Sequence, residues 1–175
     1  NHAMATDADF AMKANNYMKL ETPYNGETQV LHYLEMLRDV VGFDKLAAAV
    51  KNPLTGKKIA AYYGCLLLRP GKVLAMDNPE NPKIMEDFIR AIGATPVLYP
   101  YRNECCGGYV TMEDKNLAAK KSGTVMQSAV EAEADMMITA CPLCLYNLTK
   151  NAPEPRLPVY YFTELLAEAL GVKEA

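Results

Sequence analysis

Five cysteines carry the chemistry that this sequence suggests. They are Cys65, the adjacent pair Cys105 and Cys106, and Cys141 with Cys144. The first gap spans 39 residues and the second spans 34, whereas the last two cysteines form a C-x-x-C motif. Because five is an odd number, a closed set of intrachain disulfides cannot use every cysteine. A disulfide-stapled secreted domain would also spread its cysteines, so the spacing favours a metal or redox site.

Each part of the pattern suits thiolate chemistry. Adjacent cysteines do not easily bind one metal ion through both side chains, but they suit an iron–sulfur cluster, in which neighbouring irons take neighbouring thiolates. Five thiolates also exceed the usual four of tetrahedral zinc or of an ordinary cubane cluster. At the C-x-x-C motif, Cys141 is expected at a helix N-terminus, whose free N–H groups and dipole lower its pKa. The alternative is a set of unrelated buried thiols that pack as small hydrophobic side chains.

The elements around these cysteines predict an α/β fold. Buried apolar runs predict four strands, over 58–63, 96–99, 136–140 and 159–162. Apolar stripes predict helices over 27–41, 44–50, 82–92, 115–132, from 142 onwards, and after Thr163 to 170, with Asn81 and Thr163 as N-caps. Strands that alternate with helices imply right-handed βαβ units, and therefore a mostly parallel open sheet of about four strands with flanking helices.

This topology predicts that the cysteines meet. In an open α/β sheet, sites form beyond the carboxyl ends of the strands. Cys65 follows the first predicted strand, Cys105 and Cys106 follow the second, and Cys141 and Cys144 follow the third. We therefore expect all five thiols at one edge of one sheet.

Length and composition indicate the number of domains and argue against nucleic-acid binding and a membrane span. The 175 residues fit one domain, which we place at 26–175, after a polar arm or frayed helix at 1–25 whose first three residues resemble a tag remnant. The formal charge of -3 lacks the basic excess of a nucleic-acid-binding domain. The longest nearly apolar run, 59–68, has ten residues, whereas a membrane helix needs about 20. With no export signal visible, a reduced thiol set suits the cytoplasm.

A few other residues are candidates for roles at the site. Arg69 follows Cys65 by four residues. It is a candidate for binding an anionic thiol compound, and the alternative is an ordinary surface arginine. Arg102, before the adjacent pair, has the same two readings. Gly107 and Gly108 allow close approach of the backbone to a cluster. His32, expected on a helix far from the cysteines, fits packing or the surface better than metal binding.

The cysteine motifs of this sequence resemble those of a known protein family. The element Cys105-Cys106-Gly107 with its partner cysteines is similar to the CCG (cysteine-rich) domain of the heterodisulfide reductase B subunit, and most similar to the second such domain. The stretch AYYGCLLLRP at 61–70 resembles the lead-in to that domain, and CPLCLYNL at 141–148 resembles its last ligand helix. Related CCG domains occur in succinate, glycolate, lactate and glycerol-3-phosphate oxidoreductase subunits, but the YYGC and RP neighbours favour the heterodisulfide reductase branch.

The resemblance implies a cofactor, an activity and partners. It implies a non-cubane 4Fe–4S cluster that acts directly on a small-molecule disulfide and takes part in electron transfer. Its ligands would be Cys65, Cys105, Cys106, Cys141 and Cys144. The implied partners are a second CCG domain and the flavin and ferredoxin-like iron–sulfur subunits, because the family's protein has two CCG domains and this chain has one. Since such clusters are oxygen-sensitive, a recombinant crystal can lack the cluster or hold zinc instead.

Two alternatives remain open. One is a structural zinc-binding domain that uses four of the five thiols. The other is a cluster-free thiol–disulfide oxidoreductase that uses only Cys141 and Cys144. Metal analysis and single Cys→Ser substitutions separate these readings from the iron–sulfur hypothesis.

Overall fold

The computed structural model describes residues 1–19 and 21–172. Contacts within the chain divide it into two compact units, Asn1–Tyr33 and Leu34–Ala175. All five cysteines lie in the second unit.

The first unit contains two helices, α1 (His2–Thr6) and α2 (Ala8–Met18). Asp7 separates them and caps the second, because its Oδ1 accepts a hydrogen bond of 3.0 Å from the Phe10 N–H. After α2, the Asn15 side chain accepts from the Tyr24 N–H at 2.8 Å and donates to the Tyr24 carbonyl at 2.9 Å. These bonds fold the polar segment back against the helix.

The second unit is built on a four-stranded sheet with the order β2-β1-β3-β4, in which every neighbouring pair is parallel. Its strands are β1 (Lys58–Tyr62), β2 (Thr95–Val97), β3 (Met136–Thr139) and β4 (Val159–Tyr161). The predicted α/β class and the four strands are confirmed. Since β2 and β3 lie on opposite sides of β1, the strand order reverses there, and the crevice beyond the carboxyl ends is the expected place for a site.

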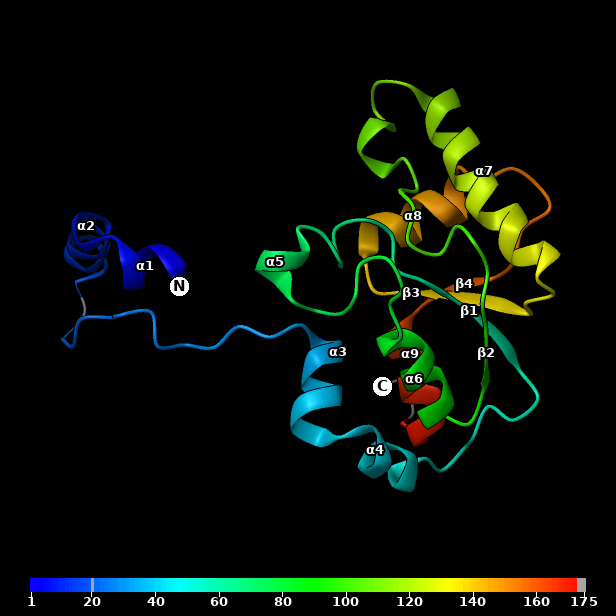
Figure 1. Cartoon of the computed structure of the whole chain (residues 1–175), viewed down its shortest axis with the longest axis horizontal. Coiled ribbons are helices and arrows are strands. Elements are labelled where there is room, and N and C mark those ends of the chain that lie inside the picture. The colour runs from blue at the N-terminus through cyan, green and yellow to red at the C-terminus, as the bar shows by residue number, and fades with distance from the viewer. Residues whose placement is uncertain (20, 173–175) are drawn as a thin grey trace. The chain divides into compact units, whose positions relative to one another are not determined.

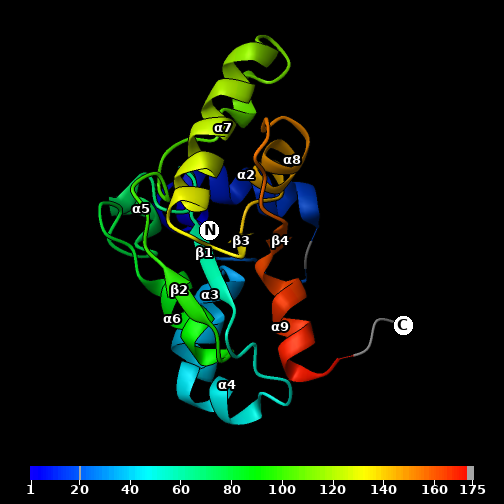
Figure 2. The same ribbon diagram turned by 90° about the vertical axis from the view of Figure 1, so that its right-hand side faces the viewer.

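The remaining helices in the described residues are α3 (Tyr33–Glu35), the π-helix η1 (Met36–Val41), α4 (Phe43–Ala49), α5 (Gly71–Leu74), α6 (Ile84–Ala91), the 3-10 helix η2 (Gly108–Val110), α7 (Lys115–Glu131), α8 (Pro142–Lys150) and α9 (Phe162–Leu170). Helices cover both faces of the sheet, with α7 and α8 on one face and α4, α6 and α9 on the other (Figure 1 and Figure 2). None of the helices in the described part of the chain is long and apolar enough to span a bilayer.

The central strand β1 divides the core into two layers. Ile59, Ala61 and Tyr63 pack into the layer beneath α6 and α9. Ala60 and Tyr62 point to the opposite face and pack with residues of α7 and α8. This alternation follows the two-residue period of a strand, and both layers are closed to solvent. The end of β1 is therefore rigidly held where the chain turns toward the first cysteine.

The helix predicted over 27–41 is shorter in the structure. Regular helix begins only at Tyr33, and His32 precedes it, so the prediction of His32 on a helix is wrong. The reason is burial: Leu34 and Leu37 are almost completely buried, whereas Val30 is 80% exposed. A helix in a protein depends on burying an apolar face, and the segment before Tyr33 does not bury one.

The N-cap predicted for α6 is also wrong. Asp77 caps this helix, because its Oδ2 accepts hydrogen bonds from the Lys83 and Ile84 N–H groups at 2.6 and 2.7 Å. A carboxylate at a helix N-terminus is also favoured by the helix dipole. Asn81 instead accepts a hydrogen bond of 2.6 Å from Arg102.

The last helix begins earlier than expected. β4 runs directly into α9, so Tyr161 occupies the N-cap position and Thr163 lies inside the first turn. Phe162 is buried between the sheet and α6, where it makes an edge-to-face contact with Phe88 at a centroid distance of 5.6 Å. Packing of this ring sets the start of the helix in place of a side-chain cap.

Candidate metal centre

The carboxyl ends of three adjacent strands, β2, β1 and β3, bring the five cysteines together. Cys65 follows β1, Cys105 and Cys106 follow β2, and Cys141 and Cys144 follow β3. All five line a single cavity of about 60 Å³. The predicted convergence of the thiols at one sheet edge is therefore what the geometry shows, and the reading of unrelated buried thiols does not account for it.

The thiols are free and differ in burial. Cys106 and Cys144 are buried, with their sulfurs 3.5 Å apart, while the other three are half-buried. Cys105 Sγ accepts a hydrogen bond of 3.4 Å from the Gly107 N–H. Among the described residues, no three His, Cys, Asp or Glu side chains form a group that could hold one metal ion. The sulfurs surround the cavity and do not meet at one point.

The two thiols of the inner pair, Cys106 and Cys144, have pKa values shifted in opposite directions. The pKa of Cys106 is lowered to about 6, first by the hydrogen bond with Cys144 and then by the Gly108 N–H and by Asn147 and Tyr62, against the opposing effect of burial. The pKa of Cys144 is raised, because its hydrogen bonds to Cys106 and Cys141 and its burial favour the thiol. Of this pair, Cys106 is therefore the sulfur whose thiolate form is favoured, and Cys144 is the one whose thiol form is favoured.

Cys141 is the second cysteine of the site whose pKa is lowered. Its pKa is lowered to about 6, first by the hydrogen bond from Cys144 and further by the backbone N–H groups of Cys144 and Leu143. Those N–H groups belong to the first turn of α8, which has Cys141 as N-cap and Pro142 in its first turn. The helix-terminus effect predicted for Cys141 is present, but the neighbouring thiol contributes more. By contrast, burial raises the pKa of Cys65.

Two glycines form tight turns next to the cysteines, where the backbone packs closely against its neighbours. Gly107 has φ 81°, and a Cβ atom added there would lie 3.1 Å from Ala118 Cα on α7. Gly64, just before Cys65, has φ 65°, and its added Cβ would lie 3.0 Å from Cys144 Sγ. A side chain at either position would be strained and crowded. Sequence reasoning selected Gly107 and Gly108, of which Gly108 lines the cavity, but missed Gly64.

Asn147 is a supporting residue that sequence reasoning missed. Its side chain is fully buried on α8, and its Nδ2 donates a 2.6 Å hydrogen bond to the Cys106 carbonyl. Its Oδ1 accepts from Thr111 at 3.2 Å and from Asn151 at 2.5 Å. The sequence shows only an asparagine one turn after Cys144. The structure shows that it is fully buried, and polar groups are retained in such positions where they are paired.

A second buried polar cluster holds the loop that precedes the adjacent cysteines. Glu86 on α6 is 1% exposed, accepts a short hydrogen bond from the Tyr63 hydroxyl, and pairs with Arg102 at 3.3 Å. The Arg102 carbonyl in turn accepts from the Tyr63 N–H at 2.8 Å. Further along the loop, the Glu104 carbonyl accepts a 2.7 Å bond from the buried Tyr62 hydroxyl. Both tyrosines at the end of β1 therefore anchor this loop.

Arg69 is placed beside the site and not in it. Its guanidinium donates to the carbonyls of Asn103 and Pro79 at 3.1 and 3.3 Å, and pairs with Glu80 at 3.1 Å. It is not among the residues that line the cysteine cavity. These bonds hold two loops together, and a role of Arg69 in substrate binding stays a prediction.

A parallel α/β sheet that places five thiols around one cavity is the arrangement of a cysteine-rich redox domain. Comparison with protein families identifies it: the model of the CCG family, described as cysteine-rich domain, matches residues 59–149. The chain belongs to this family. The matched segment runs from β1 to α8 and includes all five cysteines.

The chain is also similar to individual proteins of known name. It is 32% identical over 157 residues to the 8-methylmenaquinol:fumarate reductase membrane anchor subunit of Wolinella succinogenes, covering 85% of this chain and 55% of the relative. It is 28% identical over 183 residues to a protein of Archaeoglobus profundus described as like the heterodisulfide reductase B subunit, covering 97% and 61%. It is 26% identical over 182 residues to the B subunit of a ferredoxin/F(420)H(2)-dependent CoB-CoM heterodisulfide reductase of Methanosarcina acetivorans, covering 98% and 60%. The chain thus spans somewhat more than half the length of these curated relatives.

Proposed function

We propose that this chain is the iron–sulfur domain of a heterodisulfide-reductase-type oxidoreductase. Its five cysteines would hold a non-cubane 4Fe–4S cluster, with Cys65, Cys105, Cys106, Cys141 and Cys144 as ligands. The observation that carries the proposal is the single cavity that all five thiols line. Membership of the CCG family and similarity to heterodisulfide reductase B subunits support it.

The donor set fits such a cluster. Iron–sulfur clusters are held by thiolates, and Cys106 and Cys141 already have a pKa of about 6. Thiols spread around a cavity suit a body with several metal atoms, whereas one zinc ion needs its ligands around one point. When bound, the cluster would supply electrons received from a partner protein.

The chain's own residues would shape the place where a disulfide is reduced. Reduction of a disulfide consumes two electrons and two protons and releases two thiols. Leu66, Tyr109 and Leu143 form an apolar wall of the cavity, which limits the access of water. Asn147 fixes the Cys106 backbone, and the Tyr62 hydroxyl fixes the backbone before Cys105.

The proposed assembly includes more than this chain. Because the chain covers only 55–61% of these relatives, we propose that a second CCG domain completes the site, with this chain corresponding to the second of the two. Flavin and ferredoxin-like iron–sulfur subunits would deliver the electrons. A second candidate is a fumarate-reductase-type assembly, favoured by the relative with 32% identity. In either assembly this chain would supply the cluster domain, and the two would differ in the compound with which it exchanges electrons: a small-molecule disulfide or 8-methylmenaquinol.

Anaerobic reconstitution with iron and sulfide tests the cluster. We expect about four irons and four sulfides per chain, with a charge-transfer absorption that disappears on exposure to air. Binding of no more than one iron per chain would count against the proposal. One zinc without sulfide would support the structural zinc alternative. Loss of function only on changing Cys141 or Cys144 to serine would support the cluster-free oxidoreductase.

A further inference from the structure

Glu86 is the only acidic side chain that is buried among the described residues. A buried carboxylate is unfavourable unless its charge is paired and its oxygens are hydrogen-bonded. Its Oε2 meets this condition, because it accepts a hydrogen bond from the Tyr63 hydroxyl. Its Oε1 does not, because Arg102 Nη1 lies 3.3 Å away and no described group donates a hydrogen bond to it. The negative form of Glu86 is therefore only partly stabilised.

Charged and titratable groups face Glu86 from three parts of the fold. They are Arg90 on its own helix and Asp77 at the start of that helix, Tyr63 after β1, and Tyr99 and Arg102 after β2. Burial raises the pKa of Glu86, and this effect exceeds the opposing effects of Tyr63, Arg102 and Arg90. The Tyr99 hydroxyl is buried as well and, like Glu86 Oε1, has no hydrogen-bond partner among the described residues. These surroundings favour the protonated form of Glu86.

Glu86 is separated from the cysteine cavity by one side chain. Tyr63 lines that cavity, and its hydroxyl is bonded to Glu86. The Tyr63 N–H also donates at 2.8 Å to the carbonyl of Arg102, which precedes Cys105 by three residues. Among the described residues, the lining of the cavity contains no carboxylate, histidine or lysine. Glu86 is therefore a buried acid–base group within reach of a change of charge in the cavity.

Arg102 connects Glu86 to the surface. Its side chain is 11% exposed, and its Nη2 donates to the exposed side chain of Asn81 at 2.6 Å. Arg102 does not line the cysteine cavity. Exchange of a proton between Glu86 and water would therefore take place beside Arg102, without passage through the cavity.

We propose that Glu86 takes up one proton when the cysteine site gains an electron, and releases it when the electron leaves. This inference rests on the proposed function, because the electron must be held by a metal cluster at the cysteines. A one-electron donor protein supplies the electron, and water supplies the proton that converts the Glu86 carboxylate to the neutral acid. The Arg102 cation then has no carboxylate partner in the core, so its charge offsets the negative charge added to the site. Glu86 acts through Arg102 and Tyr63, since it does not itself line the cavity.

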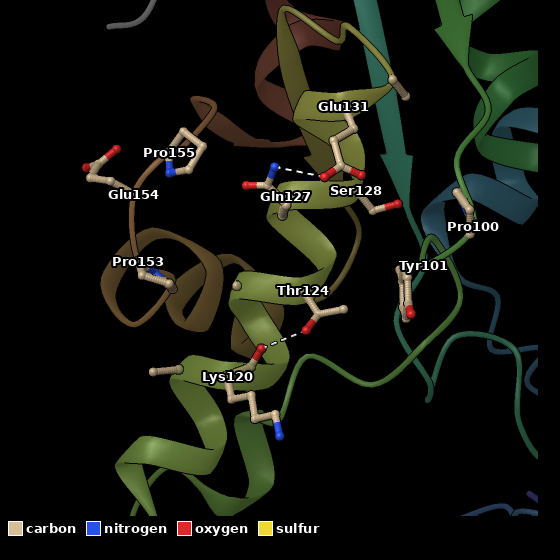
Figure 3. Close-up of a pocket in the computed structure, with 13 residues that line it drawn as sticks. Pro100, Tyr101, Lys120, Thr124, Gln127, Ser128, Glu131, Pro153, Glu154 and Pro155 are labelled. Carbon is tan, nitrogen blue, oxygen red and sulfur yellow. Dashed lines mark hydrogen bonds between the residues drawn. The ribbon is translucent and has the colours of Figure 1, made fainter.

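An exposed glutamate on α7 provides a matched control. Glu131 lines a separate open hollow of about 710 Å³, where it accepts a hydrogen bond of 2.9 Å from Gln127 (Figure 3). Among the described residues, this hollow shares no lining residue with the cysteine cavity. The substitution Glu131→Gln therefore makes the same chemical change as Glu86→Gln, but at a solvated position.

The pH dependence of the midpoint potential tests the proposal in the full chain, reconstituted anaerobically with iron and sulfide. In the wild type, the potential should fall by up to about 59 mV for each tenfold decrease in proton concentration. This slope should extend between the pKa values of Glu86 in the oxidised and reduced states. Glu86→Gln cannot release a proton, so its potential should not change over this pH range, whereas Glu131→Gln should behave like the wild type. Infrared difference spectra should show a protonated-carboxyl band that appears on reduction and is missing only in Glu86→Gln.

Tyr63→Phe separates proton uptake from a purely structural role of Glu86. The hydrogen bond from Tyr63 lowers the pKa of Glu86, so its loss should move the slope to higher pH without abolishing it. In the cluster-free chain, carbon-13 NMR of labelled glutamates should show the same order, with Glu86 titrating above the usual range and higher still in Tyr63→Phe. These measurements and the wild-type slope decide the question even if Glu86→Gln does not fold.

The results separate this proposal from the iron–sulfur function. A bound cluster whose wild-type potential does not depend on pH would overturn the role of Glu86 and leave the iron–sulfur function standing. A slope that persists in Glu86→Gln, disappears in Glu131→Gln, or fails to move in Tyr63→Phe would overturn it as well. Failure to bind a cluster at all would refute the iron–sulfur function, and the proton coupling with it.

Discussion

Replacing Asn147 by alanine should damage the site without removing any cysteine. The Cys106 carbonyl would lose its 2.6 Å bond from Asn147 Nδ2 in a fully buried position. An unsatisfied buried polar group costs about 1–3 kcal/mol, and the small cavity left by the side chain adds to this. The partners on Oδ1 contribute less, because Asn151 is half-buried and can turn toward water. We therefore expect a loss of about 2–3 kcal/mol in the free energy of unfolding.

The same substitution should change the chemistry of Cys106. Asn147 is one of the groups that lower the pKa of Cys106, although the hydrogen bond with Cys144 contributes more. Its removal should raise that pKa from about 6, so the thiolate fraction and the alkylation rate at neutral pH should both fall. Cys141, whose low pKa does not depend on Asn147, is the internal reference for peptide mapping.

Matched variants separate the hydrogen bond from volume. Asn147→Asp keeps the shape but loses the N–H donor, so it should destabilise the protein as strongly as Asn147→Ala. Asn151→Ala removes only a bond to Asn147 and should cost less than about 1 kcal/mol. Denaturant unfolding of the three variants gives the comparison. If Asn147→Ala costs no more than Asn151→Ala, or if alkylation of Cys106 is unchanged, the role assigned to Asn147 is refuted.

Three other predictions concern the same unit. Burial raises the pKa of Glu86, so its contribution to stability should be lost as the pH rises above about 4.3, and Glu86→Gln should flatten this dependence in denaturant unfolding. Gly64→Ala should cost about 1–2 kcal/mol by the same assay because φ is 65°, whereas no penalty would mean that the turn relaxes freely. In the cluster-free chain, oxidised glutathione should form the Cys106–Cys144 disulfide first, because these two sulfurs are 3.5 Å apart. Peptide mapping identifies the disulfide. A product that is mainly Cys141–Cys144 would favour the cluster-free C-x-x-C oxidoreductase.

Sequence patterns predicted the frame of the site because they reflect rules that act along the chain. Buried apolar runs located all four strands within about two residues, and alternation with helices implied a parallel sheet. From that sheet alone, the convergence of three cysteine segments followed. The long helix predicted at 115–132 is confirmed as Lys115–Glu131, because its cap and its period are both local features.

Helix starts were predicted less well, because distant partners decide them. Asn81 has the residue type of an N-cap, but the Asp77 carboxylate accepts the hydrogen bond from the Lys83 N–H at the start of the helix. The Asn81 side chain accepts a hydrogen bond from Arg102 instead. Glu86 gave no signal, because helical spacing places it beside Asp87 and Arg90, outside the apolar stripe. Only the fold shows that it is buried and that its partners are Tyr63 and Arg102.

The adjacent cysteines show most clearly what sequence patterns do not predict, because two identical neighbouring residues have different surroundings in the fold. Cys106 is 3% exposed and is tied inward by the Cys144 thiol and by Asn147. Cys105 is half-buried, and it lines both the cysteine cavity and a second hollow of about 310 Å³ beside the first half of α7. One peptide bond thus separates a sulfur held in the core from a sulfur that borders open space. The glycines that follow make this division possible, since Gly107 turns the chain through a positive φ directly after Cys106. The C-C-G motif therefore joins an inner sulfur enclosed by the core to an outer sulfur at the edge of the cysteine cavity.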